Sequence, residues 1–106
     1  MQIIRGTTPT IVITVTSELD FTTIQQVWVY ISQQNKVKVD KLISDVSFDI
    51  ENKKISVRLE QEDTLALKAN NEALFQIRLL LNDDTALATV ASDVDVIEVY
   101  KGGVIE

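Results

Sequence analysis

The chain contains no histidine and no cysteine among its 106 residues. Acid–base and nucleophilic catalysis most often use these two residue types, or a serine that histidine activates. Zinc, copper and iron sites also prefer imidazole and thiolate ligands. The two absences argue against most enzymes and predict that the protein uses no cofactor. They also exclude a disulfide framework, so the hydrophobic core must provide the stability.

Carboxylate chemistry is what remains for an enzyme of this composition. Three acidic pairs could supply it: Glu62 with Asp63, Asp83 with Asp84, and Asp93 with Asp95. A glycosidase needs two carboxyl groups across a cleft, about 5 to 9 Å apart, for which so small a domain has little room. A calcium site would need about six or more oxygens, and no EF-hand pattern is present. We interpret these carboxylates as solvated turn charges and expect the protein not to be an enzyme.

Long hydrophobic runs and excess positive charge are also missing. The net charge of −6 would repel phosphate backbones and anionic lipid, so we expect neither nucleic acid nor a membrane as partner. Apolar runs such as residues 27–31 are far below the roughly 20 residues that span a bilayer. The first residues lack the basic and apolar regions of a secretory signal peptide. We therefore expect a protein made in the cytoplasm and not exported by the general route.

Alternating apolar and polar residues recur along nearly the whole chain, a pattern typical of half-buried β-strands. Residues 61–68 differ, because they are helix formers with acidic residues first and a lysine last. We predict one domain over residues 1–106, an immunoglobulin-like antiparallel β-sandwich of about seven strands with one short helix. The paired cysteines of antibody domains are absent. The predicted strands are residues 8–16, 24–33, 36–43, 48–50, 54–60, 72–82 and 86–100.

Two local features refine this prediction. Gln34 and Asn35 form a short connection in which Asn35 tolerates a positive φ, so the strands on either side should share a sheet. Ser92–Asp93 should introduce a bulge or bend in the long last strand. The strand pattern also predicts one buried core, formed by Val27, Val29, Ile31, Ile55, Val57, Leu59, Phe75, Ile77 and Leu79.

The aromatic residues give the strongest indication of a functional surface. Since Val27, Val29 and Ile31 are expected to point inward, Trp28 and Tyr30 should stand on the outer side of the same strand. Adjacent outward aromatic residues mark a partner interface, unless another part of the chain covers them. Gln76 and Arg78 alternate with core residues on another strand, and Arg78 could lie over an aromatic ring. The candidate interface is therefore Trp28, Tyr30, Gln76 and Arg78, with a polar rim of Gln25, Gln26, Gln33 and Gln34.

Several segments together resemble a family of small proteins, about 100 residues long, encoded in phages and prophages of Gram-positive gut bacteria. The segments that carry the resemblance are residues 4–10, 27–33, 59–65, 76–79 and 102–105. The resemblance implies a β-sandwich with a structural role in the virion, in the tail or baseplate module. It supplies no catalytic or binding residues.

Three functions are consistent with these observations. The first is a phage virion structural protein that docks to other virion proteins, and that could form a homo-oligomer. The second is a carbohydrate-binding module that uses Trp28 and Tyr30 as a stacking platform. The third is an adhesin or cell-surface domain of cellular origin, which the absent export signal disfavours. We expect the first.

Overall fold

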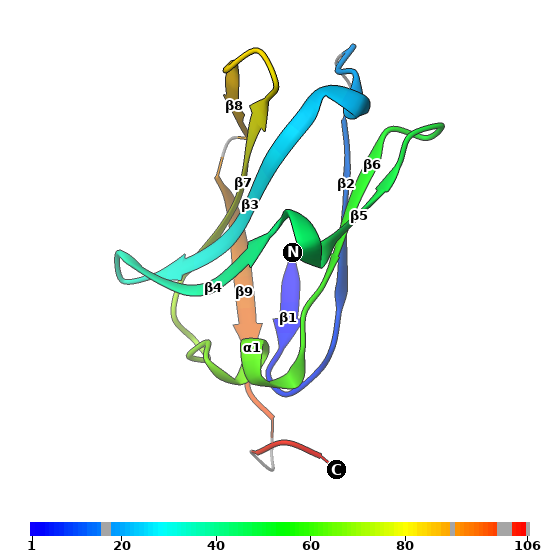
Figure 1. The fold of residues 1–106 in the computed structure, drawn as a ribbon. Helices are drawn as coiled ribbons and strands as arrows, with labels where there is room; N and C mark the ends of the chain where they lie inside the picture. Colours follow the sequence, from blue (N-terminus) through cyan, green and yellow to red (C-terminus); the bar gives the residue numbers. More distant parts are fainter. Residues whose placement is uncertain (16–17, 90, 100–102, 106) are drawn as a thin grey trace.

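The computed structural model describes residues 1–15, 18–89, 91–99 and 103–105 and consists of two β-sheets packed face to face (Figure 1). The larger sheet has the order β1-β9-β7-β3-β4, with β8 paired to the second half of β7, and the smaller sheet has the order β2-β6-β5. The larger sheet contains β1 (Gln2–Ile4), β3 (Ile24–Gln33), β4 (Lys36–Leu42), β7 (Ala73–Leu81), β8 (Ala86–Ala88) and β9 (Ser92–Ile97). The smaller sheet contains β2 (Thr10–Thr14), β5 (Val46–Asp49) and β6 (Lys54–Arg58).

This pairing confirms the predicted immunoglobulin-like sandwich. Variable-type immunoglobulin domains pair strands B, E and D in one sheet and add strand C′ beside C in the other. Here β2-β6-β5 corresponds to B-E-D, and β9-β7-β3-β4 corresponds to G-F-C-C′. The hairpin strands β3 and β4 share a sheet as predicted, because Gln34 and Asn35 adopt positive φ angles of 51° and 63° and form a two-residue turn.

The strand boundaries differ from the prediction at both ends of the chain. Strand β1 was not predicted, since three residues are too few to show an alternation, and it pairs with β9 in parallel, so the sandwich is not purely antiparallel. The predicted last strand is divided into β8 and β9, which pair with different halves of β7. The bend predicted at Ser92–Asp93 is wrong, because these residues begin β9. Positions 16 and 100, where two predicted strands end, lie outside the described residues.

The core lies between the sheets and confirms the predicted inward faces. Of the nine predicted core residues, Leu79 is partly buried and the other eight are at most 2% exposed. The core also contains buried residues that the prediction did not include, among them Ile3 on β1, Val39 on β4, and Val94 and Val96 on β9. The core therefore draws on both ends of the chain as well as on its central strands.

The helical segments are short. The predicted helix is the single turn α1 (Gln61–Leu65), and two 3-10 turns are present, η1 (Phe21–Thr23) and η2 (Ile43–Asp45). The Asp63 carboxylate accepts the Glu60 backbone N–H at 2.7 Å and so caps the start of α1. The helix ends at Leu65, and Lys68, which the prediction included in it, is hydrogen-bonded by a buried glutamine.

That glutamine, Gln33, corrects the prediction of a polar rim. It is only 2% exposed, because it continues the inward positions of β3. Its Nε2 donates to the carbonyl of Lys68 at 2.8 Å, and its Oε1 accepts the N–H of Lys68 at 2.8 Å. The amide group thus pairs with both backbone groups of Lys68, as a neighbouring strand would, and holds the connection between α1 and β7.

Candidate functional site

The candidate site is the side of the larger sheet that points away from the smaller sheet, which we call the outer face. Cross-strand register arranges its side chains in rows that begin on β4 and cross β3 and β7, and some of these rows continue onto β8 or β9. Three of these rows are Leu42–Trp28–Arg78–Ala88, Asp40–Tyr30–Gln76 and Val37–Ser32–Leu74–Asp93. The four predicted interface residues therefore occupy adjacent positions on two neighbouring strands.

Trp28 and Arg78 form the first pair. They are direct cross-strand partners, and the guanidinium carbon of Arg78 lies 5.2 Å from the centre of the Trp28 ring. This is the cation–π contact that the sequence suggested, an interaction of about 0.5 to 1 kcal/mol at an exposed site. Trp28 remains 46% exposed. The pair is an ordered cationic and aromatic surface rather than a bare aromatic platform.

Tyr30 and Gln76 form the second pair and are held more tightly. The Tyr30 hydroxyl donates to Oε1 of Gln76, and Nε2 of Gln76 donates to the carbonyl of Thr89 at 2.7 Å. Both side chains are partly buried. Their polar atoms satisfy one another, so these residues fix the centre of the outer face and offer it as a rigid surface.

Apolar side chains that the sequence did not single out surround these two pairs. Val37, Leu42 and Leu74 are 59%, 47% and 38% exposed, respectively, and all three lie on the outer face. Trp28, Val37 and Leu42 line a shallow hollow of about 500 Å³ together with Tyr30, Asp40 and Arg78. The β4 residues could have been found by pairing β4 with β3 in register. That register shifts at a bulge between Ile31 and Ser32, and the local sequence pattern does not predict the bulge.

The acidic pairs lie apart from one another. Asp63 is engaged by Lys41, whose Nζ lies 2.8 Å from Oδ2 of Asp63. The side chain of Asp83 accepts the Thr85 backbone N–H at 2.9 Å in the β7–β8 turn, and hydrogen bonding from Thr85 lowers the pKa of Asp83. Asp93 and Asp95 alternate with buried residues on β9 and are exposed. Among the described residues, no group of three or more acidic side chains is placed to hold a metal ion.

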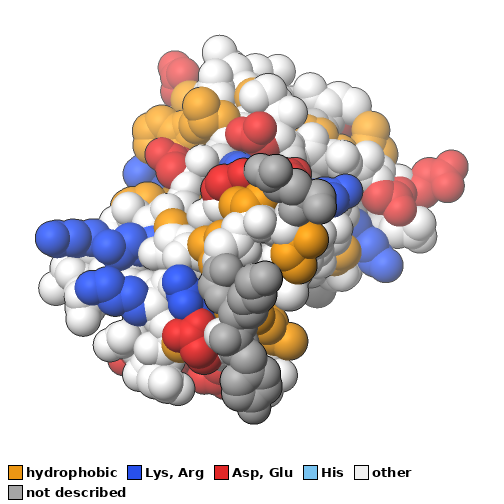
Figure 2. All heavy atoms as spheres, turned by 90° about the horizontal axis from the view of Figure 1, so that it is seen from below, with side chains coloured by type: hydrophobic (Ala, Val, Ile, Leu, Met, Phe, Trp, Pro, Cys, Tyr) orange, Lys and Arg blue, Asp and Glu red, His pale blue; other side chains and the backbone are white. Residues whose placement is uncertain are grey.

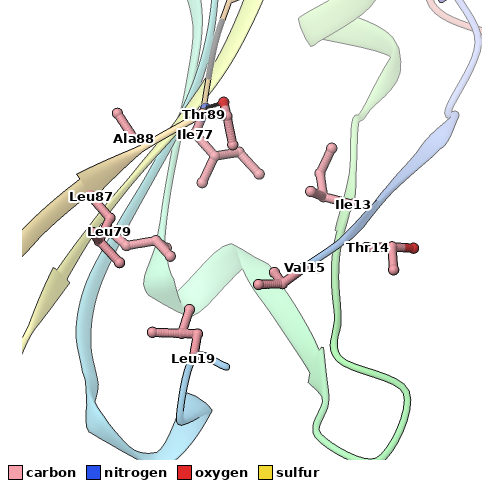
Figure 3. A pocket seen from close by; sticks show the side chains of 9 residues that line it. All are labelled: Ile13, Thr14, Val15, Leu19, Ile77, Leu79, Leu87, Ala88 and Thr89. Atoms are coloured by element: carbon pink, nitrogen blue, oxygen red, sulfur yellow. Dashed lines mark hydrogen bonds between the residues drawn. The ribbon is translucent and has the colours of Figure 1, made fainter. Parts of the chain in front are cut away.

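A second hollow lies between the two sheets, at the end where they separate (Figure 3). It has a volume of about 310 Å³, at the lower limit for a ligand site. Ile13 and Val15 of the β2 side face Ile77 and Leu79 of β7 across it, whereas Thr14 points away. The hydroxyl of Thr89 accepts the Ile77 N–H at 3.1 Å. The crevice is thus an apolar continuation of the core with few groups to orient a ligand.

Comparisons with known proteins identify no family for this chain. No protein-family model matches the chain, and no curated protein shows significant similarity to it. Within the described part of the chain, no helix has both the length and the hydrophobicity needed to cross a membrane.

Proposed function

We propose that this chain is a non-catalytic structural protein of a phage virion, in the tail or baseplate, and that it acts by docking to protein through the outer face. The observation that carries the docking role is the exposed apolar surface around Trp28 and Arg78. A domain needs one apolar face per sheet to build its core, and this sheet has two. Aromatic residues and arginine at the centre of such a surface are typical of interface anchors.

The virion assignment is supported by the family resemblance of five sequence segments and by the compact sandwich. Structural proteins of particles assemble through repeated contacts between rigid surfaces. Tyr30 and Gln76, at the centre of the outer face, are pre-organised for such a contact. Their side chains are already held by hydrogen bonds, so binding does not need to order them.

The geometry favours protein docking over a carbohydrate platform. A sugar ring stacks on a free aromatic face, but the guanidinium of Arg78 already lies over the Trp28 ring. The Tyr30 hydroxyl, which a sugar would need as a hydrogen-bonding group, is engaged with Gln76. A sugar would have to displace both contacts.

The test is the double variant Trp28→Ser with Tyr30→Ser. We expect a protein that stays folded, with a modest loss of stability from the missing Tyr30–Gln76 and Trp28–Arg78 contacts, and that no longer co-sediments with tail or baseplate particles. Each truncation should remove about 2 kcal/mol or more of association free energy. The matched control is Val12→Ser with Ile50→Ser, two apolar residues that are 50% and 59% exposed outside the outer face.

Three results would contradict the proposal. Binding of the double variant to particles as tight as wild type would remove the outer face from the interface. Absence of the chain from purified virions would remove the virion role. Wild-type binding to cell-wall polysaccharide that the double variant loses would favour the carbohydrate module instead.

A further inference from the structure

We propose that residues 103–105 of a second copy of this chain add as a strand to the free edge of β2 and place an apolar side chain in the crevice between the sheets. This inference goes beyond the docking role of the outer face, because it concerns a different surface. It is drawn from an unpaired strand edge, from the apolar crevice beside that edge, and from an apolar segment at the opposite end of the molecule.

Strand β2 has a free edge, since it pairs only with β6 among the described strands. The Val15 N–H donates to the carbonyl of Lys53 at 2.8 Å in the direction of β6. Backbone groups alternate in direction along an antiparallel strand, so those of Ile13 also bond to β6, whereas those of Val12 and Thr14 point away from it. In immunoglobulin sheets, strand A lies at this edge beside strand B, to which β2 corresponds. No described strand occupies that position here.

The free edge of β2 lacks the charges that normally prevent strand addition. Proteins commonly protect an edge strand with lysine or other charged residues. The edge strand β4 carries three lysines and an aspartate. Strand β2, with the sequence TIVIT, consists of five uncharged β-branched residues, a residue type that favours strand pairing. Its edge is therefore suited to receive another strand.

The crevice borders this end of β2, because Ile13 and Val15 line it. Its other side is lined by Leu79 of β7 and Leu87 of β8 (Figure 3). Leu87 is 41% exposed although it lines the crevice. An added strand directs alternate side chains inward, so one apolar residue of that strand would cover Leu87. The backbone groups of β2 would orient the strand, a function for which the crevice itself has few groups.

The C-terminal segment has side chains that match this site. Val104 and Ile105 are β-branched and are 45% and 80% exposed. The Ile105 N–H donates to Oε1 of Gln61 at 2.7 Å, and its carbonyl accepts from Nε2 of Gln61 at 3.1 Å. Figure 2 views this end of the molecule and shows hydrophobic side chains interspersed with acidic and basic ones. The segment is thus held through its backbone, and its own domain does not bury the Ile105 side chain.

The segment must come from a second copy, because it lies at the end of the molecule opposite β8 and the crevice (Figure 1). Since Ala73 pairs with Val94, Ile97 is level with position 70, below Ile77 and Leu79 by about 23 to 30 Å along the strands. Residues 98–103 span at most about 22 Å and would also have to reverse direction. The contact joins two different surfaces, so it can continue from copy to copy as a ring or a filament.

Two variants each remove one side of the contact. Val104→Ser with Ile105→Ser removes the apolar side chains of the segment. Thr14→Pro removes an N–H from the free edge and preserves the bonds to β6, because proline is tolerated where the N–H points away from the neighbouring strand. In sedimentation velocity, wild type should assemble, and each variant should self-associate about 30-fold or more weakly. Thr14→Ser, which keeps the N–H, is the matched control and should assemble like wild type.

A mixture of the two variants tests the contact directly. The Thr14→Pro protein keeps its segment and the serine double variant keeps its free edge, so one contact can form between them but cannot continue. An equal mixture should form one-to-one dimers and nothing larger. In wild type, hydrogen exchange of the Val12 and Thr14 amides should slow as the protein concentration rises. If Thr14→Pro does not fold, Leu87→Lys, which places a charge in the crevice, replaces it.

The outcomes separate this inference from the proposed function. Assembly of either variant as strong as that of wild type, or a mixture that stays monomeric while both variants are folded, would overturn the strand addition. Trp28→Ser with Tyr30→Ser should assemble like wild type, and loss of assembly in that variant alone would move the self-contact to the outer face. A monomeric wild type that still binds particles through Trp28 and Tyr30 would overturn the strand addition and leave the docking function standing.

Discussion

The two sheets of the sandwich differ in what their outward sides expose. On the smaller sheet, outward positions of β2, β6 and β5 are almost entirely polar, and Val12 is the apolar exception. On the larger sheet, the outer face carries Trp28, Val37, Leu42 and Leu74. Both sheets bury equally apolar inner sides in one core. The fold therefore requires only the pattern seen in the smaller sheet, and the second apolar side of the larger sheet is free to serve binding.

The largest difference in stability should be seen between truncations at an inward and an outward position of the same strand, β7. Ile77→Ala removes a side chain that is 2% exposed and should lower the free energy of unfolding by about 2 to 5 kcal/mol. Arg78→Ala, on the next residue and the opposite side, should lower it by less than about 1 kcal/mol. Urea denaturation of both variants measures the difference. Equal losses would mean that the two sides of β7 contribute alike to folding.

A smaller loss of stability should come from replacing Gln33, the buried polar residue on the inner side of β3. Gln33→Leu leaves the backbone N–H and C=O of Lys68 without their partners, at a cost of about 2 to 3 kcal/mol. Gln26→Leu, at an exposed position of the same strand, is the control and should be nearly neutral. Hydrogen exchange of the Lys68 amide should accelerate only in Gln33→Leu. Unchanged protection there would show that the glutamine does not hold the α1–β7 connection.

The smallest effect concerns the ion pair beneath the edge strand β4. The hydrogen bond to Asp63 raises the pKa of Lys41 above its ordinary value of 10.5. A raised pKa in the folded state stabilises the protein below the unfolded value and loses that effect as the pH rises through the folded value. Lys41→Met should therefore cost about 1 to 2 kcal/mol at neutral pH, and the difference from wild type should shrink above about pH 10.5. A constant difference across that range would contradict the ion pair.

Much of this arrangement follows from the alternation of residues, and the remainder depends on distant pairing. The inner faces of β3, β6 and β7 were predicted because a period of two needs only local sequence. The same period places Gln33 inward, but a polar residue at a strand end was interpreted as rim. The outer-face positions of Val37 and Leu42 depend on a bulged register between two strands, and β1 depends on a partner more than 90 residues away. Neither leaves a local signature.

The parallel pairing of β1 with β9 determines how the domain would respond to a pulling force. Asp95 N–H donates to the carbonyl of Met1 at 2.8 Å, and Arg5 N–H donates to the carbonyl of Ile97 at 3.0 Å, so the two strands are joined at both ends of the ladder. A tension applied through residues 1 and 99 pulls parallel strands past each other and loads these bonds together in shear. An antiparallel pair pulled from adjacent ends would instead open one bond at a time, like a zipper. A force applied at residues 1 and 99 would therefore be resisted by the whole β1–β9 ladder at once.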